Sequence, residues 1–257
     1  MERCERSSPW CLVLAIGAIG IWNLSAAAER GGSPDDLAGD ITAVGAQRHA
    51  NPGHGKDRSH DGMLRSGTAF FVARSGEMLT SAHVVRGCRQ IDVWPADLKS
   101  VPASLVAIDE QRDLALLATN RPVEMVAQPI ARSVRRGAPV YTIGFGLTPS
   151  TPLVPVMTRG SVRGIVQPEG HRLLVLRAAL HEGNSGGPVV DAQGELLGMI
   201  VGRYTDKPEL SVAVPVQDLA QFLHSMSIAP APPALQAPEM KPGTRLRQVS
   251  ALVQCAE

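Results

Sequence analysis

The sequence predicts an all-β fold, a sandwich or a barrel, followed by a short C-terminal helix. From residue 64 onward, apolar runs of roughly four to eight residues are separated by Gly, Pro or Asp at intervals of about ten residues, which is typical of short strands joined by turns. Segment 214–226 differs, because its apolar residues Val216, Leu219, Phe222 and Leu223 follow a helical spacing. A chain of 257 residues is long enough for one sizeable domain or two small lobes.

The expected strands follow one another closely along the chain. The first two lie in SGTAFFVARSGEMLTSAHVV, where a Ser-Gly turn separates two apolar runs. Further runs of β-branched or alternating residues occupy segments 88–98, 101–109, 113–119, 138–146, 157–167, 172–178, 187–204 and 211–216.

Residues 1–28 are predicted to direct export and not to belong to the fold. Residues 10–22 are almost entirely apolar, and the three alanines at 26–28 form a small-residue site suited to signal peptidase. The charges of Arg3 and Arg6 are largely offset by neighbouring glutamates, and the apolar run approaches the roughly 20 residues of a spanning helix. A cleaved signal peptide is favoured over an uncleaved membrane anchor. With either a cleaved signal peptide or an uncleaved anchor, we expect the folded domain to lie outside the cytoplasm, as a periplasmic or a secreted protein.

Two other segments are predicted to lie outside the core. Residues 29–62 are rich in Gly, Asp, His and Ser and too poor in apolar residues to offset the entropy of ordering, so we expect a flexible linker. His49, His54 and His60 lie in this segment at irregular spacing without a cysteine, which favours a solvated loop over a metal site. Residues 227–257 begin with a Pro-rich stretch and are predicted to form an extended tail.

The cysteines divide into two pairs. Cys4 and Cys11 belong to the export segment, which leaves Cys88 and Cys255 in the exported part of the chain. One disulfide between them would tie the tail to the region just after His83, as expected in an oxidising compartment. Two unpaired cysteines fit the sequence equally well, because spacing alone does not show proximity.

The run HEGNSGGPVVD (181–191) surrounds Ser185 with glycines, an asparagine and a proline. Glycines permit tight turns and close approach of backbone N–H groups to a ligand, so Ser185 could be a nucleophile beside a set of backbone donors. The run also matches the G-x-S-x-G elbow of α/β-hydrolases, which needs a helix after the serine and a downstream histidine. Residues 186–188, Gly-Gly-Pro, would break that helix, and His224 is the sole histidine that follows.

His83 and Asp113 precede Ser185 at the ends of expected strands, in LTSAHVVRG and DLALLA. Acyl transfer by a serine needs an imidazole to accept its proton, a carboxylate to orient the imidazole, and donors for the oxyanion. We therefore predict His83 as general base, Asp113 as its orienting group and Ser185 as nucleophile, with the N–H groups of Gly183 and Ser185 as the oxyanion hole. Taken singly, each could be an ordinary structural residue. Together, in this order within an all-β pattern, they favour catalysis.

Three motifs carry a family resemblance. TSAHVVRG, RDLALL and GNSGGPVVDAQGELLGM resemble the motif blocks of trypsin-like serine proteases of the HtrA (Deg) type, and the resemblance extends over residues 64–223. It implies two packed antiparallel six-stranded β-barrels of the chymotrypsin type within residues 63–226, with lobes at about 63–125 and 126–226 and the active site between them. It also implies endopeptidase activity on exposed or unfolded protein segments.

Two features depart from patterns known in this fold. Asn184 stands where zymogen-activated trypsins have an aspartate, so we do not expect propeptide cleavage to trigger the enzyme. The segment after Pro215 is Pro-rich and too short for the peptide-binding PDZ domain that many HtrA proteins carry.

By analogy with the family, Leu180, Val201 and Gly202 are expected to line the primary specificity pocket. Ala179 occupies the position at which trypsins hold an acidic residue for Lys or Arg side chains. The sequence therefore predicts a small or medium apolar residue at P1, the substrate position before the cleaved bond.

The expected function is that of a serine endopeptidase cleaving exported or misfolded proteins. A catalytically silent, protease-like binding module or chaperone of the cell envelope is the alternative, and the presence of all three candidate residues weighs against it. A net charge of +1 and 4% aromatic residues argue against nucleic-acid binding. No cofactor or metal is expected, and the partners are protein or peptide substrates, with membrane association if the N-terminal segment stays uncleaved.

Overall fold

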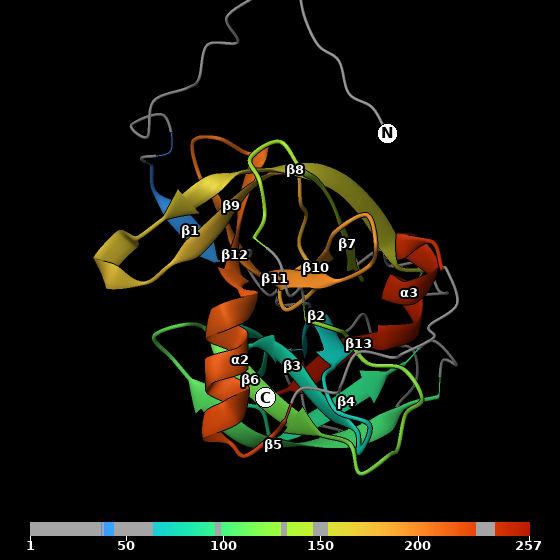
Figure 1. Ribbon diagram of the computed structural model, residues 1–257. Helices are drawn as coiled ribbons and strands as arrows, with labels where there is room; N and C mark the ends of the chain where they lie inside the picture. The colour runs from blue at the N-terminus through green and yellow to red at the C-terminus, as the bar shows by residue number, and fades with distance from the viewer. Residues whose placement is uncertain are drawn as a thin grey trace, which may run out of the picture. The chain divides into compact units, whose positions relative to one another are not determined.

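The computed structural model describes residues 37, 39–43, 64–95, 99–129, 133–145, 154–229 and 240–257. The strands among them form two antiparallel barrels, seen one above the other in Figure 1. The predicted all-β fold of two six-stranded barrels with a short helix near the C terminus is confirmed. The predicted signal peptide, and most of the predicted linker with its three histidines, lie outside the described residues.

The first barrel is built mainly from the N-terminal half of the described residues. Its strands pair in the closed order β13-β2-β3-β6-β5-β4. Their bounds are β2 (Leu64–Phe71), β3 (Glu77–Ser81), β4 (Gln90–Trp94), β5 (Val101–Asp109), β6 (Leu114–Ala118) and β13 (Ser250–Ala256). A single helical turn, α1 (Ala82–Val85), follows β3 directly.

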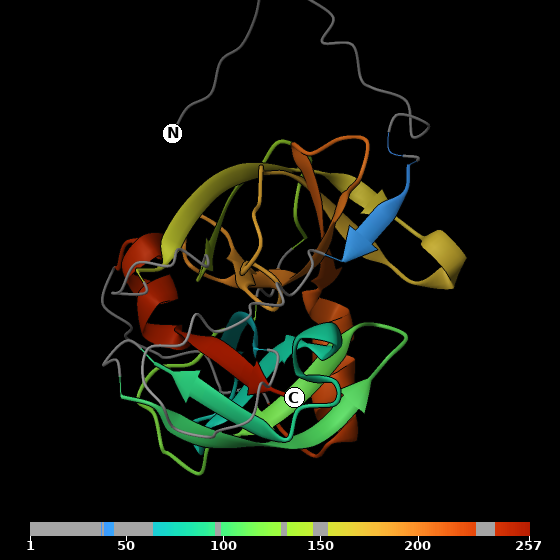
Figure 2. The ribbon, with the colours of Figure 1, turned by 180° about the vertical axis from the view of Figure 1, so that it is seen from behind.

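The C-terminal strand β13 closes the first barrel, as the red strand in Figure 2 shows. It pairs antiparallel with β2 on one side and with β4 on the other. The prediction of an extended tail over residues 227–257 is therefore wrong for its second half, where α3 (Pro242–Val249) leads into β13. The prediction failed because the preceding stretch is rich in proline, which indicated an extended tail. The strands that pair with β13 also lie more than a hundred residues earlier in the chain, so no local pattern indicated the pairing.

The second barrel pairs in the order β11-β10-β7-β8-β9-β12 and closes through β11 and β12. Its strands are β7 (Pro139–Gly144), β8 (Val156–Val166), β9 (Leu173–Arg177), β10 (Pro188–Val190), β11 (Leu196–Tyr204) and β12 (Leu210–Pro215), with a 3₁₀ turn, η2 (Pro168–Gly170), between β8 and β9. A further short strand, β1 (Ile41–Ala43), adds to the edge of β11. The prediction that residues 29–62 form only a linker is therefore wrong at β1.

Helix α2 (Val216–Ser225) follows β12 and runs along the side of the molecule in Figure 1. Its buried residues are Val216, Leu219, Phe222 and Leu223, the four that the helical spacing predicts. All four belong to the larger hydrophobic core. The amphipathic pattern therefore predicted correctly which face of α2 packs against the barrels.

One hydrophobic core spans the two barrels. Phe70, Leu79 and Leu116 from the first barrel belong to the same cluster of buried residues as Met199 and Val214 from the second. Close packing transmits small displacements, so this shared core holds the barrels in a defined relation. A separate cluster fills the remainder of the first barrel.

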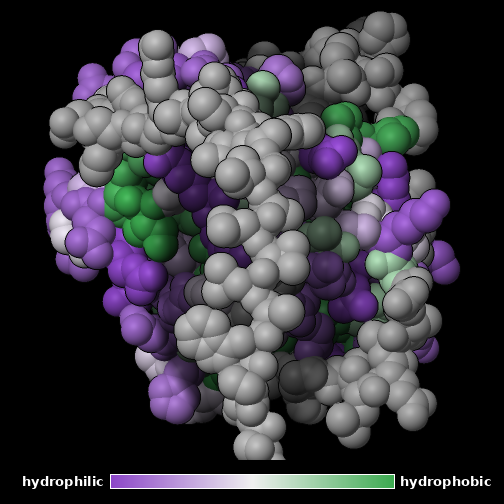
Figure 3. Space-filling model, turned by 45° about the horizontal axis from the view of Figure 1, so that its top comes forward, coloured by the Kyte–Doolittle hydropathy of each residue, from purple (hydrophilic) through white to green (hydrophobic). Residues whose placement is uncertain are grey.

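Among the coloured residues in Figure 3, hydrophilic ones predominate, with separate smaller hydrophobic areas. Large exposed apolar side chains include Val106 on β5 and Val156 and Ile165 on β8. None of the helices within the described ranges has the length and apolar character needed to cross a membrane.

The closing role of β13 leads to a stability prediction. Leu252 at its centre is fully buried between β2 and β4, so Leu252→Ala should lower the free energy of unfolding by about 2–5 kcal/mol. Urea unfolding followed by circular dichroism measures this change. The control is Gln248→Ala, at an exposed position of α3, and it is expected to stay within about 0.5 kcal/mol of the parent chain. Equal effects of the two substitutions would contradict a structural role for β13.

Candidate active site

His83 and Asp113 are in direct contact. His83 lies on α1, and its Nδ1 is 2.6 Å from Oδ2 of Asp113. The backbone N–H of His83 donates to the other carboxylate oxygen, Oδ1, at 2.9 Å. Because both oxygens are engaged by one residue, Asp113 fixes the orientation of the imidazole ring relative to its own backbone.

Asp113 itself adopts an uncommon backbone conformation. Its φ is +56°, in the left-handed region that residues other than glycine seldom occupy. Its carbonyl accepts the N–H of Ala82, which begins α1, at 3.1 Å. The turn before β6 therefore binds α1 through both its backbone and its side chain, and this contact offsets the cost of the conformation.

Ser185 lies in the turn between β9 and β10 and is 1% exposed. Gly186 has a φ of +79° and packs so closely on β2 that a side chain there would clash with the Thr68 carbonyl. Asn184 is buried, and its Oδ1 accepts the N–H of His181 at 3.1 Å. The glycines and the asparagine thus serve the tight packing of the turn.

The carbonyl of Ile200 on β11 links the two halves of the site. It accepts the N–H of Gly186, which follows Ser185, at 2.8 Å. It also accepts the hydroxyl of Ser81, two residues before His83, at 3.1 Å. A single carbonyl therefore brings the His83 turn and the Ser185 turn side by side.

The hydrogen bond between the serine and the imidazole is not formed in this structure. Within the described part of the chain, His83 Nε2 has no hydrogen-bond partner. Such bonds are often long or poorly aligned before substrate binds. The Nε2 atom, on the ring edge opposite Asp113, is thus buried without a hydrogen-bond partner among the described residues.

Sequence reasoning missed Thr68, which anchors the Ser185 turn to the first barrel. Its backbone N–H donates to the Ser185 carbonyl at 2.8 Å, and its hydroxyl donates to the Gly183 carbonyl at 2.6 Å. The same hydroxyl accepts the N–H of Phe145 at 3.2 Å. In the sequence, Thr68 is recognisable only as a small polar residue inside an apolar strand. Many strand residues without any role in a site have the same character.

Gly67 beside it supports the same arrangement. A Cβ at this position would lie 2.7 Å from a methyl carbon of Val84 on α1 and 3.0 Å from the Ser185 carbonyl oxygen. Both turns therefore approach β2 at one point, and a glycine is needed there for lack of space.

The residues predicted to line a specificity pocket fall in different environments. Val201 is 8% exposed and lines a cleft of about 670 Å³ whose wall also includes Asp113 and Ile41. Leu180 is 1% exposed and belongs to the hydrophobic core that spans the two barrels. Gly202 is buried and lies opposite Ala43 of β1 in the same sheet. Ala179, at the position of the trypsin acid, is exposed.

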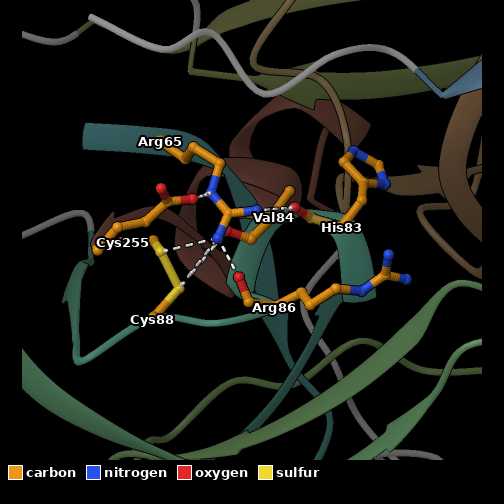
Figure 4. Close-up of a disulfide and its surroundings, with 7 residues drawn as sticks. Arg65, His83, Val84, Arg86, Cys88 and Cys255 are labelled. Carbon is orange, nitrogen blue, oxygen red and sulfur yellow. Dashed lines mark hydrogen bonds and ion pairs between the residues drawn. A yellow bond between two sulfur atoms is a disulfide. The ribbon is translucent and has the colours of Figure 1, made fainter. Parts of the chain in front are cut away.

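Cys88 and Cys255 form a disulfide that ties β13 to the loop after α1, shown in Figure 4. Arg65 on β2 lies over this disulfide, with Nη2 3.6 Å from Cys255 Sγ. Its guanidinium donates to the backbone carbonyls of His83, at 2.9 Å, and Arg86, and it pairs with the Glu257 carboxylate. The planar fork of donors therefore holds both ends of the turn that carries His83.

The fold and the site define a serine-protease-like double barrel, and comparisons with known proteins agree. The family described as "Trypsin-like peptidase domain" matches residues 67–199, and the chain belongs to this family. The resemblance to HtrA-type proteases predicted from the sequence is also confirmed.

Among curated relatives, the serine protease Rv3671c of Mycobacterium tuberculosis is 28% identical over 165 residues, which is 60% of this chain and 40% of the relative. Serine protease HTRA1 of Xenopus tropicalis is 30% identical over 164 residues, 62% of this chain and 35% of the relative. The chain thus spans about two fifths or less of the length of these relatives.

Two solved structures show the same fold. The active form of Rv3671c has a TM-score of 0.57 and 25% identity, covering 65% of this chain and 75% of that one. The HtrA-type protease AlgW, solved with a decapeptide, has a TM-score of 0.56 and 26% identity, covering 63% of this chain and 51% of that one.

The Thr68 contacts lead to a second stability prediction. Thr68→Val keeps the shape of the side chain but leaves the buried Gly183 carbonyl and Phe145 N–H without this partner, which should cost about 1–3 kcal/mol of unfolding free energy. Thermal or urea unfolding measures the cost. Thr244→Val, at an exposed position of α3, is the matched control and should stay near the parent value. An unchanged stability of Thr68→Val would show that the anchor is dispensable.

Proposed function

We propose that the protein is a serine endopeptidase that uses His83, Asp113 and Ser185. The observation that carries the proposal is the double attachment of His83 to Asp113, through the backbone N–H and through Nδ1. The other ring nitrogen, Nε2, has no hydrogen-bond partner among the described residues. Membership of the trypsin-like peptidase family supports it.

In the proposed mechanism, His83 Nε2 takes the proton of the Ser185 hydroxyl as Oγ attacks the substrate carbonyl carbon. Asp113 keeps the imidazole in the required tautomer and stabilises the imidazolium that forms. The N–H groups of Gly183 and Ser185 would bind the developing oxyanion, with each donor typically contributing about 3 kcal/mol. His83 then protonates the leaving amine, and water hydrolyses the acyl-enzyme.

The proposed substrates are exposed or unfolded segments of exported proteins. A chain segment in extended form can add to a sheet edge by backbone hydrogen bonds, so binding would require no folded epitope. The HtrA-type protease AlgW was solved with a decapeptide, which supports peptides as ligands in this family. Export itself would depend on the N-terminal 28 residues, cleaved as a signal peptide or retained as an anchor.

The test of the nucleophile is covalent labelling with a fluorophosphonate probe. The parent chain should be labelled, and Ser185→Ala should lose both the label and, by about 10⁶-fold, peptide hydrolysis. Asp113→Asn should lower kcat by about 10⁴-fold, because the imidazole would lose its tautomer control. Ser75→Ala, at an exposed turn, is the control and should label normally. A folded Ser185→Ala chain that still labels would refute the assignment, and unlabelled parent protein that still binds unfolded protein would favour the binding module.

Specificity is tested with a peptide library. We expect preference for small or medium apolar residues at P1, since Val201 lines the cleft and Ala179 offers no charge for a basic side chain. Cleavage sites identified by mass spectrometry report this preference. A profile dominated by Lys or Arg at P1 would contradict the proposed pocket.

A further inference from the structure

Two consecutive hydroxyl side chains end strand β3, directly before the turn that carries His83. Thr80 and Ser81 are both fully buried. Successive side chains of a strand point to opposite faces, so the two hydroxyls reach different partners. Both belong to the first barrel, and both are bonded to residues that also hold the Ser185 turn of the second barrel.

Ser81 occupies the N-cap position of α1, where a serine hydroxyl ordinarily accepts a hydrogen bond from the first turn of the helix. Within the described residues around α1, its side chain makes no such cap bond. The hydroxyl instead donates to the Ile200 carbonyl of β11 at 3.1 Å. That carbonyl also accepts the N–H of Gly186 at 2.8 Å. The Ser81 hydroxyl therefore serves a contact between the barrels and not its own helix.

Thr80 makes a parallel connection on the other face of β3. Its hydroxyl donates to the Thr68 carbonyl at 2.7 Å, and the N–H of Thr68 donates to the Ser185 carbonyl at 2.8 Å. The end of β3 thus reaches the nucleophile turn through two series of hydrogen bonds. One series ends at Ser185 and the other at Gly186.

Gly186 packs directly against the end of β3. An added Cβ would overlap the Thr80 hydroxyl and the Thr68 carbonyl, and it would lie 2.9 Å from the Ser81 nitrogen. No side chain therefore separates the residue after the candidate nucleophile from the two residues before α1. Because this interface is closely packed, a displacement of the Thr80–Ser81 segment is transmitted to the turn that carries Ser185.

We propose that Ser81 is a positioning residue, which sets the distance between His83 and Ser185. Thr80 shares this role. The inference rests on the proposed function and concerns the geometry of the same site. A general base must lie within about 2.6–3.2 Å of the group whose proton it takes, and a misplacement of about 1 Å can lower the rate by about 10²-fold. Asp113 orients the imidazole within the first barrel, whereas the two hydroxyls fix its turn relative to the second.

The test compares Ser81→Ala with Thr119→Val. Thr119 is also buried, and its hydroxyl donates to the Gly76 carbonyl at 2.9 Å, so each variant loses one buried hydrogen bond of the same kind. Both should lower the free energy of unfolding. Ser81→Ala should also lower kcat for a fluorogenic peptide by about tenfold and keep KM within about twofold, because Ser81 does not line the cleft. Thr119→Val should keep the parent kcat.

The double variant Thr80→Val/Ser81→Ala removes both connections. Since either connection alone can restrain the turn, kcat should fall by more than the product of the two single effects. Fluorophosphonate labelling of Ser185 should slow in parallel, because it depends on the same proton transfer. Urea unfolding gives the folded fraction of each variant, to which its rate is normalised.

The outcomes separate this inference from the proposed function. A Ser81→Ala chain with the same kcat as Thr119→Val, a loss confined to KM, or a double variant whose loss does not exceed the product would overturn the positioning role alone. Parent protein that is neither labelled nor able to hydrolyse the peptide would overturn the proposed function instead.

Discussion

The position of the candidate nucleophile depends on the contact between strand β2 and the Ser185 turn. Thr68 on β2 binds the carbonyls of Ser185 and Gly183 with its N–H and its hydroxyl. This contact is buried. Without Thr68, each of the two carbonyls would be removed from water without gaining a hydrogen-bond partner, which costs free energy. Strand β2 is in turn held by β13, which closes the first barrel. The conformation of a turn in the second barrel is thus determined by a strand of the first and by the C-terminal end of the chain.

The two barrels contribute different chemical groups to the site. The first supplies the His83–Asp113 pair on α1 and the turn before β6, and the second supplies the Ser185 turn. Neither barrel alone could place an imidazole beside a hydroxyl. Their relation is maintained by the shared core and by the Ile200 carbonyl, which binds Ser81 from one side and Gly186 from the other. Close packing at this interface therefore controls the distance on which proton transfer would depend.

Each barrel also pairs with a strand that is distant in sequence from its partners. Strand β13 fills the gap between β2 and β4, and the disulfide of Cys88 with Cys255 fixes its end beside the His83 turn. Near the start of the described residues, β1 extends the edge of β11 that the Ser185 turn also uses. Closing the long loops between such strands costs conformational entropy. No local sequence pattern marks the pairing, because many short runs of apolar or small residues can form such a strand. This explains why a tail and a linker were expected at these places.

The features that could be predicted from the sequence depend on residues close together in the chain. The spacing of apolar runs indicated an all-β fold, the helical period identified the buried face of α2, and the motif order singled out His83, Asp113 and Ser185. The support that Thr68 and Arg65 give to the site, the closure of a barrel by β13 and the pairing of β1 with β11 are seen only in the folded molecule. The physical reason is that periodicity and turn chemistry are properties of neighbouring residues. Hydrogen bonds between distant strands exist only once the chain has packed, and they then depend on geometry more than on residue type.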